Sequence, residues 1–414
     1  MLGTERTAIG RGLAIGRGSH GPPWRRRKPL HVPIVAPLTA TLAAGAAIGL
    51  GLTLARAGRE RREARDRQRT RRLGVFAHEP LSGAFKRMAA EQLDLAIEEL
   101  SAGNGAGPPD VAIHESRKAL KRLRTMGRAL EAVHGEQAVA QETAALKDVA
   151  GQLSDARDAE VMLATLDALM KRHPRKLDRR GVRRLRARLA HESEAARAQT
   201  LGDPVRMALV VADLSACRLR VETWQHPKRR ERDLLEPGLK RIYGHGRRRY
   251  KHAQAAKGDP AVAMHEWRKA VKDLRYLGEM LQRRPSPPGL GRALPGSPGP
   301  RKGRPDRASE PLRKLARRAD ELGEMLGEEH DLAVLAERVR RSHGKKAVEP
   351  HLGPKTRNAL LKAIAKRRRT LQRRALKQGK ALYGTPTKKF VRRNSELYMR
   401  ARRKALRRTQ KPLS

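Results

Sequence analysis

The sequence has 414 residues, of which 93 are Lys or Arg and 43 are Asp or Glu, so the formal net charge is +50. A charge of this size calls for a polyanionic partner, such as nucleic acid, an acidic membrane or a phosphate polymer. Aromatic residues are only 3% of the chain, which disfavours single-stranded nucleic acid, because its bases stack on aromatic side chains. The lone cysteine, Cys217, excludes an intrachain disulfide, fits a reducing compartment and is expected to be buried.

The N-terminal part divides into three segments. Residues 1–32 are rich in Gly and Arg without a hydrophobic period, which predicts a disordered basic arm. Residues 33–55 run for 23 positions without a charge, a length that can span a bilayer, but they are weakly hydrophobic and rich in Ala and Gly. A single membrane anchor and a segment that does not span both stay open. Residues 56–73 form an Arg-rich linker, whose charge would keep the C-terminal bulk of an anchored chain in the cytoplasm.

From Leu73 to Lys404 the apolar residues recur three and four positions apart, which predicts an all-α fold. Helix breaks are expected at residues 103–110 and near Pro174, Pro204, Pro260 and Pro386. The Pro- and Gly-rich residues 285–308 predict a disordered insertion, and residues 406–414 a basic tail.

An internal repeat organises this helical part. HESRKALKRLR begins at His114, and HEWRKAVKDLR begins 151 positions later at His265. Further on, LSDARDAEVMLA from Leu153 resembles LGEEHDLAVLA from Leu326. With about four helices in each unit, the repeat predicts two four-helix bundles, residues 74–220 and residues 221–405.

A helical wheel gives each repeated helix an apolar side and a cationic side. A charged side is also what any surface helix shows, but these stripes are almost free of the acidic residues that usually neutralise a solvated face. Similar stripes occur on other predicted helices, so we interpret them as an anion-binding surface. Its candidate residues are Arg117, Lys118, Lys121, Arg122, Arg124, Arg268, Lys269, Lys272 and Arg275 in the repeat, and Lys240, Arg247, Lys251, Lys362, Lys366, Arg369 and Arg373 outside it.

Histidine and acidic residues accompany the stripes. His114 and His265 stand at the predicted helix starts, where each can bind a phosphate oxygen or serve only a structural role. Asp158 and Asp331 are expected to cap a helix or to pair with an arginine. The His-Glu pairs lack the second histidine of a zinc motif, so neither a metal nor another cofactor is expected. The sequence has no nucleophile–base arrangement or Gly-rich phosphate loop that stands out, which predicts a non-enzymatic protein.

The doubled histidine motif, the two Leu-x-x-x-x-Asp segments and the ending ALYGTPTKKFVRR together resemble the CHAD family over about residues 74–405. The resemblance implies two four-helix bundles related by a pseudo-two-fold axis, with a basic central groove or pore that binds inorganic polyphosphate. It places the ligand on His114 and His265 and on the repeated basic residues. No strand typical of the triphosphatase domains found fused to family members is visible, so a stand-alone binder is expected. Asp273 and Glu279 interrupt the second stripe, which favours the first copy as the stronger contributor.

The resulting hypothesis is a polyphosphate-binding protein that targets or organises polyphosphate granules. The alternative is a basic protein that binds the phosphate backbone of RNA or DNA. A cytoplasmic location is expected, either at granules or at the inner face of the plasma membrane through residues 33–55. The sequence leaves the oligomeric state open.

Overall fold

The computed structural model describes residues 73–76, 79–101, 109–177, 180–224, 230–256, 260–284, 310–341 and 352–409. The predicted arm at 1–32, the apolar segment at 33–55, the insertion at 285–308, nearly all of the linker at 56–73 and the last residues of the basic tail lie outside these ranges. Within the ranges, no helix combines the length and apolar character needed to cross a membrane.

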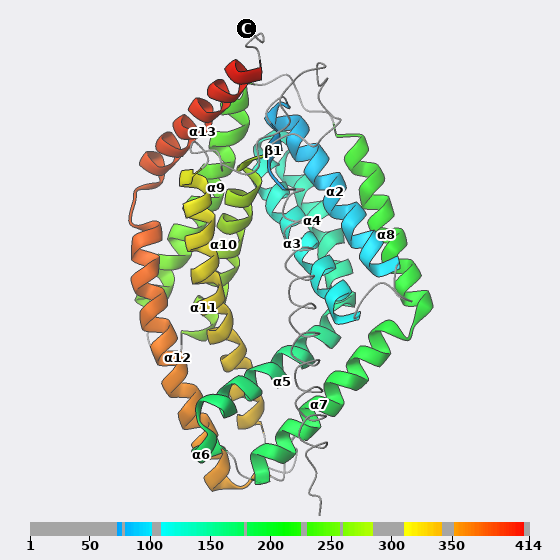
Figure 1. Cartoon of the computed structure of the whole chain (residues 1–414), viewed down its shortest axis with the longest axis vertical. Coiled ribbons are helices and arrows are strands. Elements are labelled where there is room, and N and C mark those ends of the chain that lie inside the picture. The colour runs from blue at the N-terminus through cyan, green and yellow to red at the C-terminus, as the bar shows by residue number, and fades with distance from the viewer. Residues whose placement is uncertain are drawn as a thin grey trace, which may run out of the picture. The chain divides into compact units, whose positions relative to one another are not determined.

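The described part of the chain is almost entirely helical, which confirms the all-α prediction (Figure 1). The first half contains α2 (Leu81–Ser101), α3 (Pro109–His134), α4 (Glu136–Gln152), α5 (Ser154–Arg172), α6 (Pro174–Leu177), α7 (Arg180–Leu201) and α8 (Pro204–Glu222). The second half contains α9 (Glu231–Ala255), α10 (Ala261–Met280), α11 (Glu310–Arg340), α12 (Pro354–Tyr383) and α13 (Thr387–Thr409).

Helix ends fall where the predicted breaks lie, and the capping chemistry shows why. Asp203 caps α8 by accepting a hydrogen bond of 2.9 Å from the backbone nitrogen of Arg206, and Pro204 occupies the first position, where no amide hydrogen is needed. Two further breaks were not predicted. Gly135 takes a positive φ of 85° between α3 and α4, and Leu153 separates α4 from α5. The first half therefore has more helices than the four that the repeat predicted.

A short pair of parallel strands, β1 (Val75–Phe76) and β2 (Arg283–Arg284), was also missed. Two residues are too few to leave an alternating pattern in the sequence. The backbone nitrogen of Val75 also donates to the Gln282 carbonyl at 2.8 Å. These bonds attach the chain segment before α2 to the end of α10, and so join the two halves.

The helices of the two halves pack in the same order. The contacts of α2 with α3, α3 with α4, α5 with α7, and α2 with α8 have counterparts in α9 with α10, α10 with α11, α11 with α12, and α9 with α13. This order is what an internal duplication produces. The main difference is that α11 continues without interruption where the first half has the separate helices α4 and α5.

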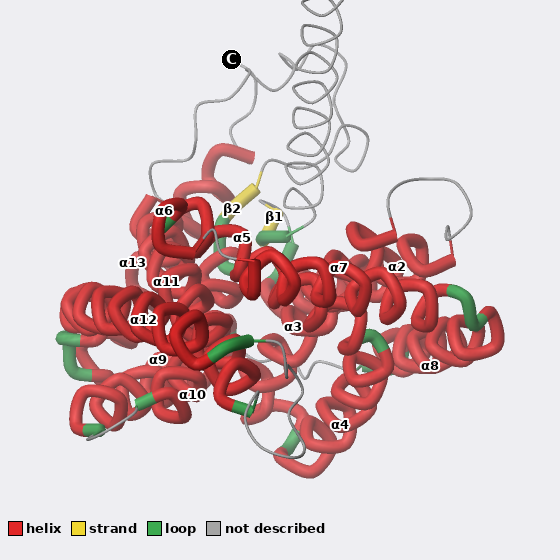
Figure 2. The backbone as a smooth tube through the Cα atoms, turned by 90° about the horizontal axis from the view of Figure 1, so that it is seen from below, coloured by secondary structure: helices red, strands yellow, loops and turns green. Residues whose placement is uncertain are grey.

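Two hydrophobic cores hold the helices together, and both draw on each half of the chain. The larger core joins α2, α3, α4 and α8 to α9, α10, α13, the first part of α11 and the last part of α12. The smaller core joins α5, α6 and α7 to the second part of α11 and the first part of α12 (Figures 1 and 2). The division between residues 220 and 221 expected for the two bundles therefore does not coincide with a division of the core.

Candidate anion-binding site

The site is built on α3 and α10, the two helices that carry the repeated motif. Leu120 and Met126 of α3 and Val271 and Leu274 of α10 are buried in the larger core, so each helix turns its opposite side outward from that core. The contacts of α3 with α10 bring the two basic sides together. We define the central basic cluster as the five residues Arg117, Lys121, Arg124, Arg268 and Lys272.

Lys121 lies at the middle of this cluster. Burial, followed by the charges of Lys272, Arg117, Arg268 and Arg124, lowers the pKa of Lys121 to about 7. Lys121 and Lys272 occupy equivalent positions of the repeat, each seven residues after the histidine that begins the motif. A half-buried ammonium beside four other cations is unfavourable, and a bound anion would relieve that cost.

Lys272 has a milder environment. Burial and the charge of Arg268 lower its pKa, but the carboxylates of Glu324 and Asp331 on α11 oppose this, and the pKa is about 8. Carboxylates act strongly on Lys272, whereas the charges that act most strongly on Lys121 are all cationic. The part of the cluster that lies on α3 is therefore the more strongly positive.

Two arginines of the central basic cluster have a donor that no described residue accepts from. The Nε atoms of Arg124 and Arg268 are buried without a hydrogen-bond partner among the described residues. Arg268 packs against α11, where a β-carbon at Gly327 would stand 3.5 Å from its Nε and Nη2 atoms. Arg117 donates from Nη1 to the Ala150 carbonyl at 3.0 Å, which fixes its side chain beside α4. Arginine donors arranged in this way can bind phosphate oxygens in pairs.

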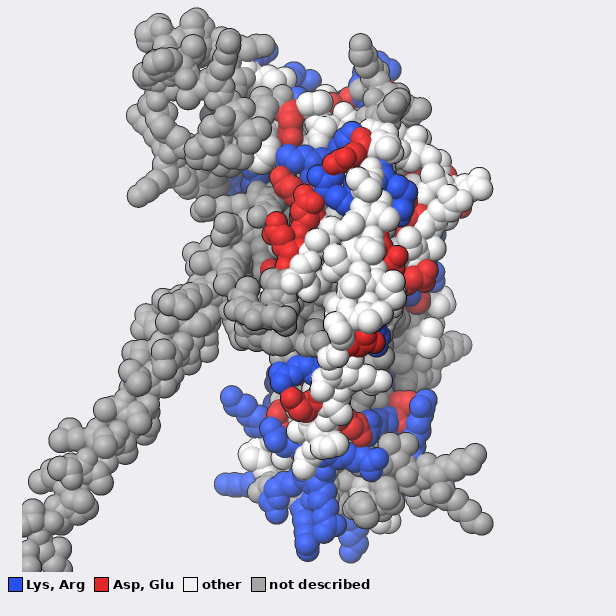
Figure 3. Space-filling view, turned by 90° about the vertical axis from the view of Figure 1, so that its right-hand side faces the viewer, with Lys and Arg blue, Asp and Glu red and all other residues white. Residues whose placement is uncertain are grey.

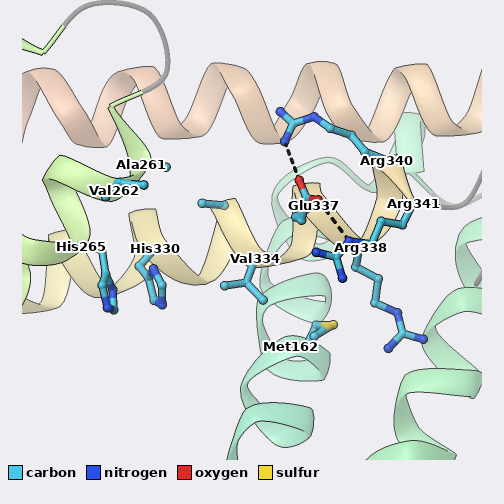
Figure 4. A pocket seen from close by; sticks show the side chains of 11 residues that line it. Met162, Ala261, Val262, His265, His330, Val334, Glu337, Arg338, Arg340 and Arg341 are labelled. Carbon is cyan, nitrogen blue, oxygen red and sulfur yellow. Dashed lines mark hydrogen bonds and ion pairs between the residues drawn. The ribbon is translucent and has the colours of Figure 1, made fainter.

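A pair of histidines extends the site along α10 and α11, which pack antiparallel. The rings of His265 and His330 lie with their centroids 4.1 Å apart and point the same way (Figure 4). They line a pocket of about 670 Å³ whose wall includes Met162, Val262 and Val334. Burial is the first cause that lowers the pKa of both, and the pKa of His330 falls to about 4 under the added charges of His265 and Arg268.

This histidine pair predicts a loss of stability in acid. Because the folded-state pKa of His330 is below its ordinary value of 6.5, the unfolded chain binds more protons, and stability falls as the pH drops from about 6.5 towards 4. For a side chain that is partly exposed we expect about 1 kcal/mol between pH 7 and pH 5. Urea unfolding at the two pH values should show a smaller difference in His330→Gln than in the wild type. An equal difference in both proteins would contradict this role of His330.

Other basic residues of the repeat are held by carboxylates. Lys118 lies 3.8 Å from Glu115, and Lys269 pairs with Glu266. Arg275 is bound at 2.7 Å by Glu279 and also pairs with Asp320 of α11. His114 is exposed on the first turns of α3. Lys118, Lys269 and Arg275 are therefore each paired with a carboxylate, whereas the charges that act most strongly on Lys121 are all cationic.

Arg122 departs from the prediction that it binds the ligand. Its side chain is only 1% exposed, and its Nη1 donates to Gln92 of α2 at 3.1 Å. Its Nη2 lies 3.9 Å from Oε2 of Glu279 on α10. Arg122 stands at the edge of the stripe, where contacts with α2 and α10 cover it, so the structure places it in the core rather than on the anion-binding surface.

Asp158 and Asp331, which occupy equivalent positions of the internal repeat, do not begin helices. Asp331 lies well inside the continuous helix α11, and α5 starts at Ser154, before Asp158. The expected helix caps are therefore wrong for both. Asp331 acts instead on the cluster, because its charge raises the pKa of Lys272. Asp158 is exposed on α5.

The stripes predicted outside the repeat lie on α9 and α12. Lys240 and Lys251 are exposed on α9, and Arg247 donates from Nε to the Tyr383 carbonyl at 3.2 Å. On α12 the four predicted side chains are exposed, namely Lys362, Lys366, Arg369 and Arg373. None of these seven appears among the leading charges that act on Lys121 or Lys272.

Sequence reasoning named Asp331 of α11 but missed His330 and Glu324 on the same helix. His330 and Glu324 come into the site because α10 and α11 pack antiparallel, which pairs Gly278 with Ala316 and, further on, His265 with His330. The only signal was the EEHD segment, which has no histidine in the first copy. Asp273 was noticed, but its partners were not: it accepts a hydrogen bond of 2.9 Å from Thr125 and pairs with Arg128 of α3.

The fold and the site together define an all-α protein whose repeated basic helices enclose a desolvated cluster of cations. The model of the CHAD domain matches residues 87–292, which contain both α3 and α10. The chain therefore belongs to the CHAD family, and the resemblance drawn from the repeated motif is confirmed.

Solved structures similar to this chain include the CHAD domain from the plant Ricinus communis, at 23% identity and a TM-score of 0.49, covering 73% of this chain and 94% of that one. PptA from Streptomyces chartreusis is similar at 16% identity and a TM-score of 0.48, covering 73% of this chain and 99% of that one. Curated proteins give no match to the sequence.

Proposed function

We propose that this protein binds inorganic polyphosphate in the central basic cluster. The observation that carries the proposal is the environment of Lys121, whose pKa is lowered to about 7 by burial and by four neighbouring cations. A phosphate chain bound there places negative charge beside all five residues of the cluster, which stabilises the folded protein. The family resemblance points to the same ligand.

The composition of the surface favours a polymer without bases. All five tyrosines, all three phenylalanines and Trp267 are buried, and Trp224 is half-buried. The described surface therefore offers few aromatic rings on which bases could stack. Lysine point charges and arginine forks are sufficient for a linear phosphate chain. We propose in addition that the protein binds polyphosphate without catalytic activity. It would act in the cytoplasm by targeting or organising polyphosphate granules.

A competition experiment tests the ligand. Labelled long-chain polyphosphate is bound at a fixed salt concentration, because electrostatic affinity depends steeply on salt, and is then challenged with tRNA or duplex DNA. We expect nucleic acid to displace the label only at a large excess of total phosphate. Displacement at comparable phosphate concentration would overturn the specificity for polyphosphate and favour a nucleic-acid-binding protein.

A further inference from the structure

The outer side of α8 is apolar and has no partner in the described chain. Val205, Leu209 and Leu219 are 67%, 60% and 65% exposed, three of the five most exposed large apolar side chains in the described residues. Ala212 is exposed between them. The opposite side of the same helix packs into the larger core. We call the exposed residues 205, 208, 209, 212, 216 and 219 the α8 stripe.

Charges on α8 lie along the edges of the α8 stripe and bind residues of the same chain. Arg218 donates from Nε to Asp94 at 2.8 Å and from Nη1 to Glu222 at 2.7 Å. Arg220 pairs with Glu142 of α4, and Arg206 donates to the Gln152 carbonyl. Figure 3 shows this side of the molecule with an uncharged band that has acidic residues along its edges and basic side chains above and below it.

The surface around α8 is therefore close to neutral in a chain whose net charge is +50. From Asp203 to Glu222 the segment carries three acidic and three basic residues, which balance. Two copies of the chain can approach each other here without the repulsion that their other surfaces impose. An anionic lipid surface is a poorer match, because the balanced charges of this segment give no net attraction to its headgroups.

The α8 stripe is also close to symmetric about Ala212. Val205 and Leu219 lie seven residues on either side of it, and Ala208 and Ala216 lie four residues on either side. In an antiparallel pair centred on Ala212, each bulky end residue faces the other bulky residue of the second copy, and the alanines face alanines. Small central residues let two helices approach closely, and a surface that matches itself is what a two-fold interface requires.

We infer that two copies of this chain associate through their α8 stripes as an antiparallel helix pair, with the two-fold axis at Ala212. The stripe from Val205 to Leu219 is about 21 Å long at the usual rise of a helix. An interface of that length is at the small end of specific interfaces, so we expect a dissociation constant on the order of micromolar.

Cross-linking tests the predicted symmetry in the full-length protein without any polyanion. In a Cys217→Ala background, a short bis-maleimide should link Ala212→Cys to itself efficiently. Val205→Cys alone should not cross-link, whereas a mixture of Val205→Cys and Leu219→Cys should. Self-linkage of Val205→Cys would mean a parallel pair, and failure of Ala212→Cys to link in a protein with wild-type helicity would rule out the proposed axis.

Sedimentation measures the association itself. We expect wild-type protein to show a monomer–dimer equilibrium, and Ala212→Glu to weaken it at least tenfold while helicity is unchanged. Val262→Glu is the matched control, because Val262 is 76% exposed on α10, and it should associate as the wild type does. A wild type that stays monomeric up to 100 µM overturns the inference. Flotation of that monomer with vesicles of phosphatidylcholine and phosphatidylserine would identify a membrane as the occupant instead.

Discussion

Replacing both Lys121 and Lys272 by glutamate is expected to weaken polyphosphate binding at least about 100-fold, because two charge-assisted contacts are lost and two repulsive charges are introduced. Burial and neighbouring cations lower the pKa of these two side chains to about 7 and about 8. Fluorescence anisotropy with labelled polyphosphate, alongside circular dichroism to check the helices, measures the effect.

Lys240→Glu with Lys251→Glu is the matched control. Both residues are exposed on α9, and this pair changes the net charge by the same amount. We expect the control to lose no more than about threefold in affinity. Equal losses in the two double variants would show that the ligand responds to the overall charge of the protein, and would contradict a localised site.

A neutral replacement separates binding from stability. Lys121→Met with Lys272→Met keeps an unbranched side chain only one atom shorter and removes the half-buried like charges, so the melting temperature should rise while affinity falls. A variant that loses both affinity and stability would instead indicate that the two lysines support the fold.

The affinity for polyphosphate should also fall as the pH rises from 7 to 9. Without bound polyphosphate, Lys121 and Lys272 have pKa values of about 7 and about 8 and lose protons over this range. A bound phosphate chain raises both pKa values, so binding takes up protons, and the free energy of binding becomes less favourable with each unit of pH. We expect a decrease on the order of 10- to 100-fold across the two units.

Calorimetry in two buffers of different ionisation enthalpy measures this proton uptake directly. Long polyphosphate is required, because the internal phosphates do not titrate between pH 7 and 9. The Met double variant should bind with little dependence on pH. Proton uptake that is equal in the variant and the wild type would place the titrating groups outside the central basic cluster.

The helical fold was predictable because its determinants are local. The three- and four-residue period of apolar side chains and the Pro and Gly breaks specify helices without any knowledge of their neighbours, and the structure confirms them. The same period identified the basic side of α3 and α10. It could not separate Lys121, which faces α10 across the site, from Arg122, which α2 covers.

The rest of the site depends on which helices pack together. His330 and Glu324 act on α10 only because α11 runs antiparallel to it and continues without a break through Asp331. The sequence of α11 carries no signal for that continuity, since the corresponding residues of the first half are interrupted at Leu153. The strand pair at Val75 and Arg283 is equally a product of tertiary contacts.

The smaller core contains residues from both halves of the chain, so either half alone would lack part of it. Leucines of α5 and α7, such as Leu166 and Leu185, are covered by α11 and α12 from the other half. A chain that ended after α8 would need a second molecule to cover them, and its folding would depend on protein concentration. Joining both halves in one polypeptide makes that encounter intramolecular, so the site between α3 and α10 forms even when the protein is dilute.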